Sequence, residues 1–136
     1  MTRMVDTKIL LAVTDLLPEM FRVILEEGGF KNIELRPEDD RGFFTRYRPG
    51  DYGLFIAQPS SSPPGMMKGL ELLSEVRKHD PRAKFLVVSG GPKTSTQQWI
   101  KDLNLGDYSY LDLPCTRDEL LKAVVRALTD HHESAA

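Results

Sequence analysis

Side chains that could carry chemistry stand directly after short apolar runs of the chain. Thr14 and Asp15 follow the first such run, and Gln58 and Ser89 follow two later ones. Together they offer two hydroxyls, one amide and one carboxylate. Such a set can hydrogen-bond a polar ligand, but Mg²⁺ prefers a near-octahedral shell of oxygens that usually includes carboxylate charge. We therefore expect no Mg²⁺ site and no other cofactor.

Each of these side chains also has a purely structural interpretation. Asp15 suits the N-cap of a following helix, which needs only one oxygen near a free N–H. Gln58 can hydrogen-bond the backbone of a loop and hold a pocket shut. Ser89 can satisfy backbone groups where its strand meets a turn at residues 90–91. We favour capping for Asp15 and the structural role for Gln58.

The other reactive residue types lack the neighbours that catalysis or metal binding requires. Residues 90–94 contain two glycines and a lysine without the spacing of a P-loop, so they predict a turn. Cys115 has no histidine or acid beside it in a catalytic pattern and is expected to be a passive thiol. The serines at 60–62 have no adjacent base and indicate a loop. His79 and the pair at 131–132 are too few for a metal site. We assign no catalytic residue and no metal ligand, and expect no enzyme.

The elements that position these residues follow from the hydrophobic pattern. Short apolar or alternating runs predict five strands, at residues 9–13, 33–35, 54–57, 85–88 and 108–113. Amphipathic segments predict helices at residues 17–25, 66–76, 99–103 and 116–128, with a short, weak helix within 38–48. Gly28–Gly29 ends the first helix, and Thr116 with Glu119 forms a capping box that opens the last one.

Strands that alternate with helices in this way indicate an α/β fold with a parallel sheet covered on both faces. Five strands favour the flavodoxin-like, doubly wound order 2-1-3-4-5. In such a sheet the ligand crevice lies at the carboxyl ends of strands 1 and 3, which brings Thr14, Asp15, Gln58 and Ser89 to one edge. The last strand alternates rather than being solidly apolar, so we expect it at an edge of the sheet.

Length and composition restrict the protein to a few classes. Its 136 residues allow one compact domain, which we place at residues 8–129 between short tails at 1–7 and 130–136. The 18 Lys and Arg against 20 Asp and Glu give a net charge of −2, and no basic run is present to bind nucleic acid or an anionic membrane. A single cysteine fits a reducing compartment, and the apolar run at 9–13 is too short for a signal peptide or a membrane span. We expect a cytoplasmic protein.

Several pieces of the sequence, in their order and spacing, resemble the receiver domain of bacterial two-component response regulators over nearly the whole chain. They are the strand opening at 8–11, the helical segment at 69–73, the strand end at 87–89, the glycine-aromatic stretch at 105–111, and Pro114. The resemblance implies the receiver architecture and a role in signal transduction. It also implies that an Asp at the end of strand 3 accepts a phosphoryl group from a histidine kinase.

The sequence departs from that family's pattern at the positions that do the chemistry. The phosphoacceptor position falls on Gln58, and an amide is not a competent carboxylate nucleophile. The acidic pair that helps to hold Mg²⁺ falls on Val13–Thr14 or on Thr14–Asp15, so at most one carboxylate remains. The family's Lys position falls on Leu113, which cannot pair with a phosphoryl oxygen, and only Ser89 keeps the family's hydroxyl. These positions form a degenerate phosphoacceptor pocket, where we expect no phosphotransfer.

Without the phosphoryl chemistry, function must depend on surfaces. In the resembled family the fourth helix, fifth strand and fifth helix form the face that dimerises or docks partners. Trp99, Tyr108 and Tyr110 lie in or beside those elements, Tyr110 at the position of the family's aromatic switch residue, and Trp and Tyr are enriched at binding hot spots. Alternatively, Trp99 faces the core with Ile100 and Leu103. Tyr108 and Tyr110 share one strand face, so either helices cover both or both line the partner surface.

We therefore predict an atypical, phosphorylation-independent receiver domain that acts as a protein-interaction module. Its partner would be a histidine kinase, an output domain or a second copy of the chain. One alternative is a small-ligand sensor that uses the crevice near Asp15, Gln58 and Ser89 or the turn at 90–91. Another is a regulatory domain excised from a larger response regulator. An enzyme of flavodoxin-like fold has no nucleophile–base pair to support it.

Overall fold

The computed structural model describes residues 4–14, 17–36, 40–59 and 67–129. Its centre is a sheet of five parallel strands in the order β2-β1-β3-β4-β5. The strands are β1 (Lys8–Ala12), β2 (Asn32–Leu35), β3 (Leu54–Ala57), β4 (Phe85–Ser89) and β5 (Ser109–Asp112). The helices are η1 (Met4–Asp6), a 3₁₀ turn, and α1 (Leu17–Glu27), α2 (Asp40–Arg46), α3 (Gly69–His79), α4 (Lys93–Asp102) and α5 (Arg117–Leu128). The predicted fold class, the strand order and the edge position of the last strand are confirmed.

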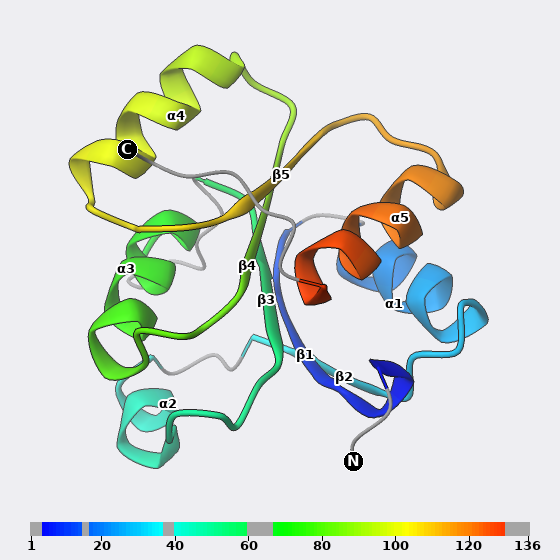
Figure 1. Cartoon of the computed structure of the whole chain (residues 1–136), viewed down its shortest axis with the longest axis horizontal. Helices are drawn as coiled ribbons and strands as arrows, with labels where there is room; N and C mark the ends of the chain where they lie inside the picture. The colour runs from blue at the N-terminus through cyan, green and yellow to red at the C-terminus, as the bar shows by residue number, and fades with distance from the viewer. Residues whose placement is uncertain (1–3, 15–16, 37–39, 60–66, 130–136) are drawn as a thin grey trace.

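Helices cover both faces of the sheet, with α1 and α5 together on one face and α2, α3 and α4 on the other (Figure 1). Side chains alternate along the strands, so Ile9 and Leu11 enter the core beside α1 and α5, whereas Leu10 and Ala12 enter the core beside α2, α3 and α4. Every residue of β3 and β4 is buried, because strands in the middle of a doubly covered parallel sheet meet helices on both sides.

The helix boundaries differ most from the prediction at α4. The sequence predicts a helix at 99–103, whereas α4 begins at Lys93. Its first turns are rich in Thr, Ser and Gln, so apolar periodicity could not reveal them. Gly29 ends α1 with φ +99°, a left-handed conformation that favours glycine, and Thr116 and Glu119 form the predicted capping box. Over the described residues, no helix combines the length and apolar character needed to cross a membrane.

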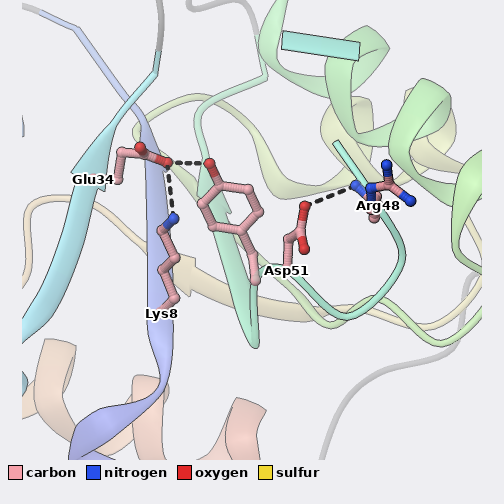
Figure 2. Close-up of polar contacts among 5 residues, drawn as sticks. Lys8, Glu34, Arg48 and Asp51 are labelled. Atoms are coloured by element: carbon pink, nitrogen blue, oxygen red, sulfur yellow. Dashed lines mark hydrogen bonds and ion pairs between the residues drawn. The ribbon is translucent and has the colours of Figure 1, made fainter. Parts of the chain in front are cut away.

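A polar cluster ties the edge strand β2 to β1 and to the segment before β3 (Figure 2). The Tyr52 hydroxyl donates to the Glu34 carboxylate, and Lys8 Nζ lies 4.0 Å from Glu34 Oε2 and 4.9 Å from the centre of the Tyr52 ring. The Asp51 carboxylate accepts the backbone N–H of Arg48 at 2.8 Å, which fixes the turn that leads into Tyr52. Burial, together with the contact with Glu34, raises the pKa of Tyr52, so its hydroxyl keeps its proton and acts as a donor.

The Arg77 guanidinium holds two loops against the end of α3. It donates four hydrogen bonds of 2.7–2.9 Å to backbone carbonyls, those of Pro81, Ala83, Leu105 and Asp107. It also lies 4.3 Å from the centre of the Phe85 ring. The accepting carbonyls belong to the turn before β4 and to the loop between α4 and β5. One side chain therefore satisfies backbone groups in both connections.

Replacing Arg77 by Lys should lower the free energy of unfolding by about 2–4 kcal/mol, because a lysine keeps the charge but cannot reach four carbonyls in a fixed fork. Urea denaturation followed by circular dichroism measures the change. The control is Arg22→Lys, since Arg22 is exposed and pairs with Glu26 one helical turn away. That variant should stay within about 0.5 kcal/mol of the original chain. Equal stability of the two variants would contradict the role given to Arg77.

Candidate functional site

The carboxyl ends of β1, β3 and β4 meet at one edge of the sheet, where the sequence predicts the functional side chains. The parallel register of these strands places Thr14, Gln58 and Ser89 together at that edge. Asp15, the fourth predicted side chain, lies outside the described residues, as do the serines at 60–62 and the histidines at 131–132.

Gln58 ties the end of β3 to the loop after β1. Its carboxamide oxygen accepts the backbone N–H of Thr14 at 2.8 Å and lies 3.3 Å from the Thr14 hydroxyl, which also donates to it. The Gln58 backbone N–H donates to the Ala12 carbonyl at 3.2 Å. An atom 2.8 Å from an N–H donor must be the oxygen of the carboxamide, which fixes the orientation of the amide. The predicted hydrogen bond between Gln58 and loop backbone is therefore present, with the Thr14 N–H as the donor.

Ser89 closes the turn that leads from β4 towards α4. Its hydroxyl oxygen accepts the backbone N–H of Gly91 at 3.1 Å, as the structural interpretation predicts. The same oxygen lies 3.5 Å from the Thr96 hydroxyl of α4. Both side chains are buried, each residue being 6% exposed. Two hydroxyls thus face each other beneath the turn.

Val13 and Leu113 occupy the remaining positions of the degenerate pocket. Both pack with the core between the sheet and the helices α1 and α5, and Val13 is only 7% exposed. In the part of the chain that the structure describes, no three His, Cys, Asp or Glu side chains gather where they could hold a metal ion. The described side of this edge therefore presents an amide and hydroxyls to a ligand.

Cys115 lies just beyond this edge and is partly buried. Burial raises the pKa of its thiol, and the nearby Glu119 carboxylate acts in the same direction. At neutral pH the thiol therefore stays protonated, which lowers its nucleophilicity. This agrees with the passive role predicted for it.

The three aromatic residues predicted for a partner face are more buried than that role requires. Tyr108 is 2% exposed and belongs to the core on the α3 and α4 side of the sheet. The prediction that it lines a partner surface is wrong, because helices cover that strand face. Trp99 and Tyr110 are partly buried against the same core, and the Tyr110 hydroxyl is buried without a hydrogen-bond partner among the described residues. Lys68 Nζ lies 5.6 Å from the Trp99 ring, and Lys93 Nζ lies 5.1 Å from the Tyr110 ring.

A cleft of about 280 Å³ opens beside Gln58, between the ends of β3 and β4 and the inner side of α4. Ser89, Thr96 and Trp99 contribute to its walls, together with the turn at 90–91. Thr96 was not predicted as a site residue, because the predicted helix begins only at residue 99. Its spacing of three residues from Trp99 is the signal that could have placed both on one helix face.

The start of α3 lies directly against the backbone of Gln58. The Leu70 N–H donates to the Pro59 carbonyl at 3.2 Å. A β-carbon at Gly69 would lie 1.8 Å from the Gln58 carbonyl oxygen, a distance that no side chain tolerates. Glycine at this position therefore allows α3 to begin immediately beside the end of β3.

Known proteins support the fold through the similarity of their structures, whereas their sequences give no match. No family model and no curated protein matches the sequence. Solved structures do match. A response regulator receiver domain protein from Methanospirillum hungatei JF-1 is 20% identical, with a TM-score of 0.72, and the alignment covers 93% of this chain and 96% of that one. The isolated receiver domain of RcsB from Salmonella enterica serovar Typhimurium is 16% identical, with a TM-score of 0.70 and coverage of 94% and 92%.

Chemotaxis protein CheY4 of Vibrio cholerae is similar to the same degree. It is 20% identical, with a TM-score of 0.71 and coverage of 90% of this chain and 99% of that one. The chain has the fold of a receiver domain. Identities of this size establish the architecture, whereas activity must be argued from the residues at the site.

Replacing Gly69 by Ala should lower the free energy of unfolding by about 1–3 kcal/mol, because the new β-carbon collides with the Gln58 carbonyl and must displace α3. The result is diagnostic because alanine otherwise favours a helix over glycine. Thermal and urea unfolding provide the measurement.

The matched control is Gly91→Ala in the same region. A β-carbon there would meet only the Ser89 hydroxyl at 3.7 Å, an ordinary contact. Its unfolding free energy should change by no more than about 0.5 kcal/mol. A Gly69→Ala variant as stable as this control would show that α3 does not depend on the close approach.

Proposed function

We propose that the protein is an atypical receiver domain that acts in signal transduction by binding another protein, without phosphorylation at the usual position. Gln58 at the end of β3 carries this proposal. Its carboxamide oxygen is a neutral acceptor held by the backbone N–H and the hydroxyl of Thr14. A phosphoryl group transferred at this position would need a carboxylate nucleophile.

The neighbouring positions support the same conclusion. Leu113 packs with the core and offers no cation to a phosphoryl oxygen. Ser89 retains a hydroxyl, but that hydroxyl is used in the turn that it closes. The proposal requires no Mg²⁺, and it places the protein in the cytoplasm, in keeping with a single cysteine in a chain of 136 residues. The similarity to receiver domains supports the signalling role.

The face formed by α4, β5 and α5 is the proposed contact surface. Its exposed side chains include Gln98 and Lys101 of α4 and Asp112 of β5. A face of this polarity suits a reversible contact rather than a permanent one, because obligate interfaces are more apolar. Trp99 and Tyr110 are partly buried against the core on the α3 and α4 side of the sheet. The proposed partners are a histidine kinase, an output domain or a second copy of the chain.

Incubation of the full chain with acetyl phosphate and Mg²⁺ should leave its intact mass unchanged, because Gln58 provides no carboxylate at the acceptor position. Mass spectrometry immediately after incubation is the measurement, and a conventional receiver domain treated in parallel shows that the donor is active. An added phosphoryl group that hydroxylamine removes would identify an acyl phosphate and overturn the proposal. Because such an adduct requires a carboxylate, the same experiment on Asp15→Asn would then show whether Asp15 is the acceptor.

A photoreactive amino acid placed at Gln98 or Lys101 should crosslink the same partner protein in cells of the source organism. Both positions are exposed on α4, so the substitutions leave the core intact. The partner is identified by mass spectrometry, and its affinity for the purified chain should fall in Lys101→Glu, since reversing a charge at an interface rim opposes association.

Lys78 on α3 is the control position, because its side chain is 69% exposed and lies outside the proposed face. Crosslinks to the partner from Lys78 as efficient as those from α4 would refute the assignment of the face. Absence of any protein crosslink from both Gln98 and Lys101 would refute the interaction role. Crosslinked dimers of the chain would support it, with a second copy as the partner.

A further inference from the structure

The cleft beside Gln58 has the size of a site for one small ring. Its volume is about 280 Å³, close to the lower end of about 300 Å³ seen for small-molecule sites. It lies beyond the carboxyl ends of β3 and β4, the side of a doubly wound sheet on which ligands bind. The described side chains that line it carry no charge. An uncharged ligand is therefore favoured, since a charged one would lose hydration without gaining an ion pair.

The Ser89 and Thr96 hydroxyls at the cleft include one proton that has no hydrogen-bond acceptor among the described residues. Ser89 and Thr96 each carry one hydroxyl proton, and the contact of 3.5 Å between their oxygens uses only one of them. The other recorded partner of Ser89 is the Gly91 N–H, which is itself a donor. One hydroxyl proton thus has no acceptor among the described residues, at a position where both residues are 6% exposed. A ligand acceptor would satisfy it.

Gln58 supplies a second set of donors. Thr14 holds the carboxamide oxygen, and the amide nitrogen occupies the other arm of the same planar group. This nitrogen has two N–H donors, and no described residue accepts from it. Gln58 lines the cleft. The walls therefore offer donors from Gln58 and from the Ser89–Thr96 pair, and a complementary ligand must present acceptors.

Trp99 forms an aromatic wall of the cleft. A flat ring can stack on an indole, and such aromatic contacts contribute beyond the area that they bury. The described lining residues thus combine a stacking surface with donors that no described residue accepts from, and they carry no charge.

We propose that this cleft binds an uncharged, planar, single-ring cyclic amide or imide. Its ring lies against Trp99, and its carbonyl oxygens accept from Gln58 Nε2 and from the spare hydroxyl proton of the Ser89–Thr96 pair. The inference does not depend on the proposed function, because it concerns the inner side of α4 and requires no protein partner.

Trp99 is the only tryptophan of the chain, so its fluorescence reports on this cleft directly. The full chain is titrated with uracil, 2-pyridone and succinimide, and in parallel with benzene, a flat ring without nitrogen or oxygen acceptors. At least one of the three carbonyl compounds should change the emission in a saturable way, with half-saturation in roughly the millimolar range expected of so small a ligand. Benzene should give no saturable change. Failure of all three, or an equal response to benzene, would overturn the proposal.

Variants test the two sets of donors. Thr96→Val removes a hydroxyl at nearly constant volume and should weaken binding about fivefold to tenfold. Gln58→Glu keeps an acceptor for Thr14 but loses the N–H donors, and should weaken binding at least as much. The control is Thr94→Val on the exposed side of α4, which should bind as the original chain does. Circular dichroism confirms that each variant is folded, and unchanged affinity in folded Thr96→Val and Gln58→Glu would overturn the assignment.

Discussion

The hydrogen bonds from Thr14 to Gln58 decide which atoms the carboxyl edge of the sheet can offer. A carboxamide has an acceptor end and a donor end, and Thr14 holds the acceptor end from 2.8 Å. The backbone of Gln58 is held as well, because α3 begins at Gly69 within a distance that excludes any β-carbon. A residue fixed on both sides cannot turn its oxygen outward. Among the described residues, this edge is therefore neutral and rich in donors, where a phosphoryl-accepting site would require negative charge and a metal.

The sheet could be predicted because strands buried on both faces have a strong sequence signature. Residues 54–57 and 85–88 are uninterrupted apolar runs, and every residue of β3 and β4 is buried. The first turns of α4 could not be predicted in the same way. Only Thr96 and Ile100 are buried along its ten residues, so its inner face is too sparse to produce a helical period.

At the site, too, the sequence predicts where residues stand along the strands but not how closely the elements contact one another. The place of Gln58 at the end of a strand follows from the pattern of apolar runs, whereas its likeness in position to a phosphoacceptor is implied by the resemblance to receiver domains. The cleft could not be predicted from the apolar runs, because it depends on how closely Thr96 and Trp99 approach the end of β4. Tyr108 and Tyr110 likewise show that spacing along the chain does not reveal burial. Their spacing of two residues puts them on one strand face, but only the packing of helices on that face shows that Tyr108 is 2% exposed.

The two proposed binding regions lie on opposite sides of α4. Thr96 and Trp99 face the cleft and the core, whereas Gln98 and Lys101 face outward. Interactions at the two regions are coupled only to the extent that each favours a different position of this helix. If a ligand that fills the cleft draws α4 towards β4, it changes the affinity of a partner on the outer face, and the partner changes the affinity of the ligand by the same factor. If α4 keeps one position, the two regions bind independently. The physical link between them is therefore the ten-residue helix α4, whose buried residues are Thr96 and Ile100.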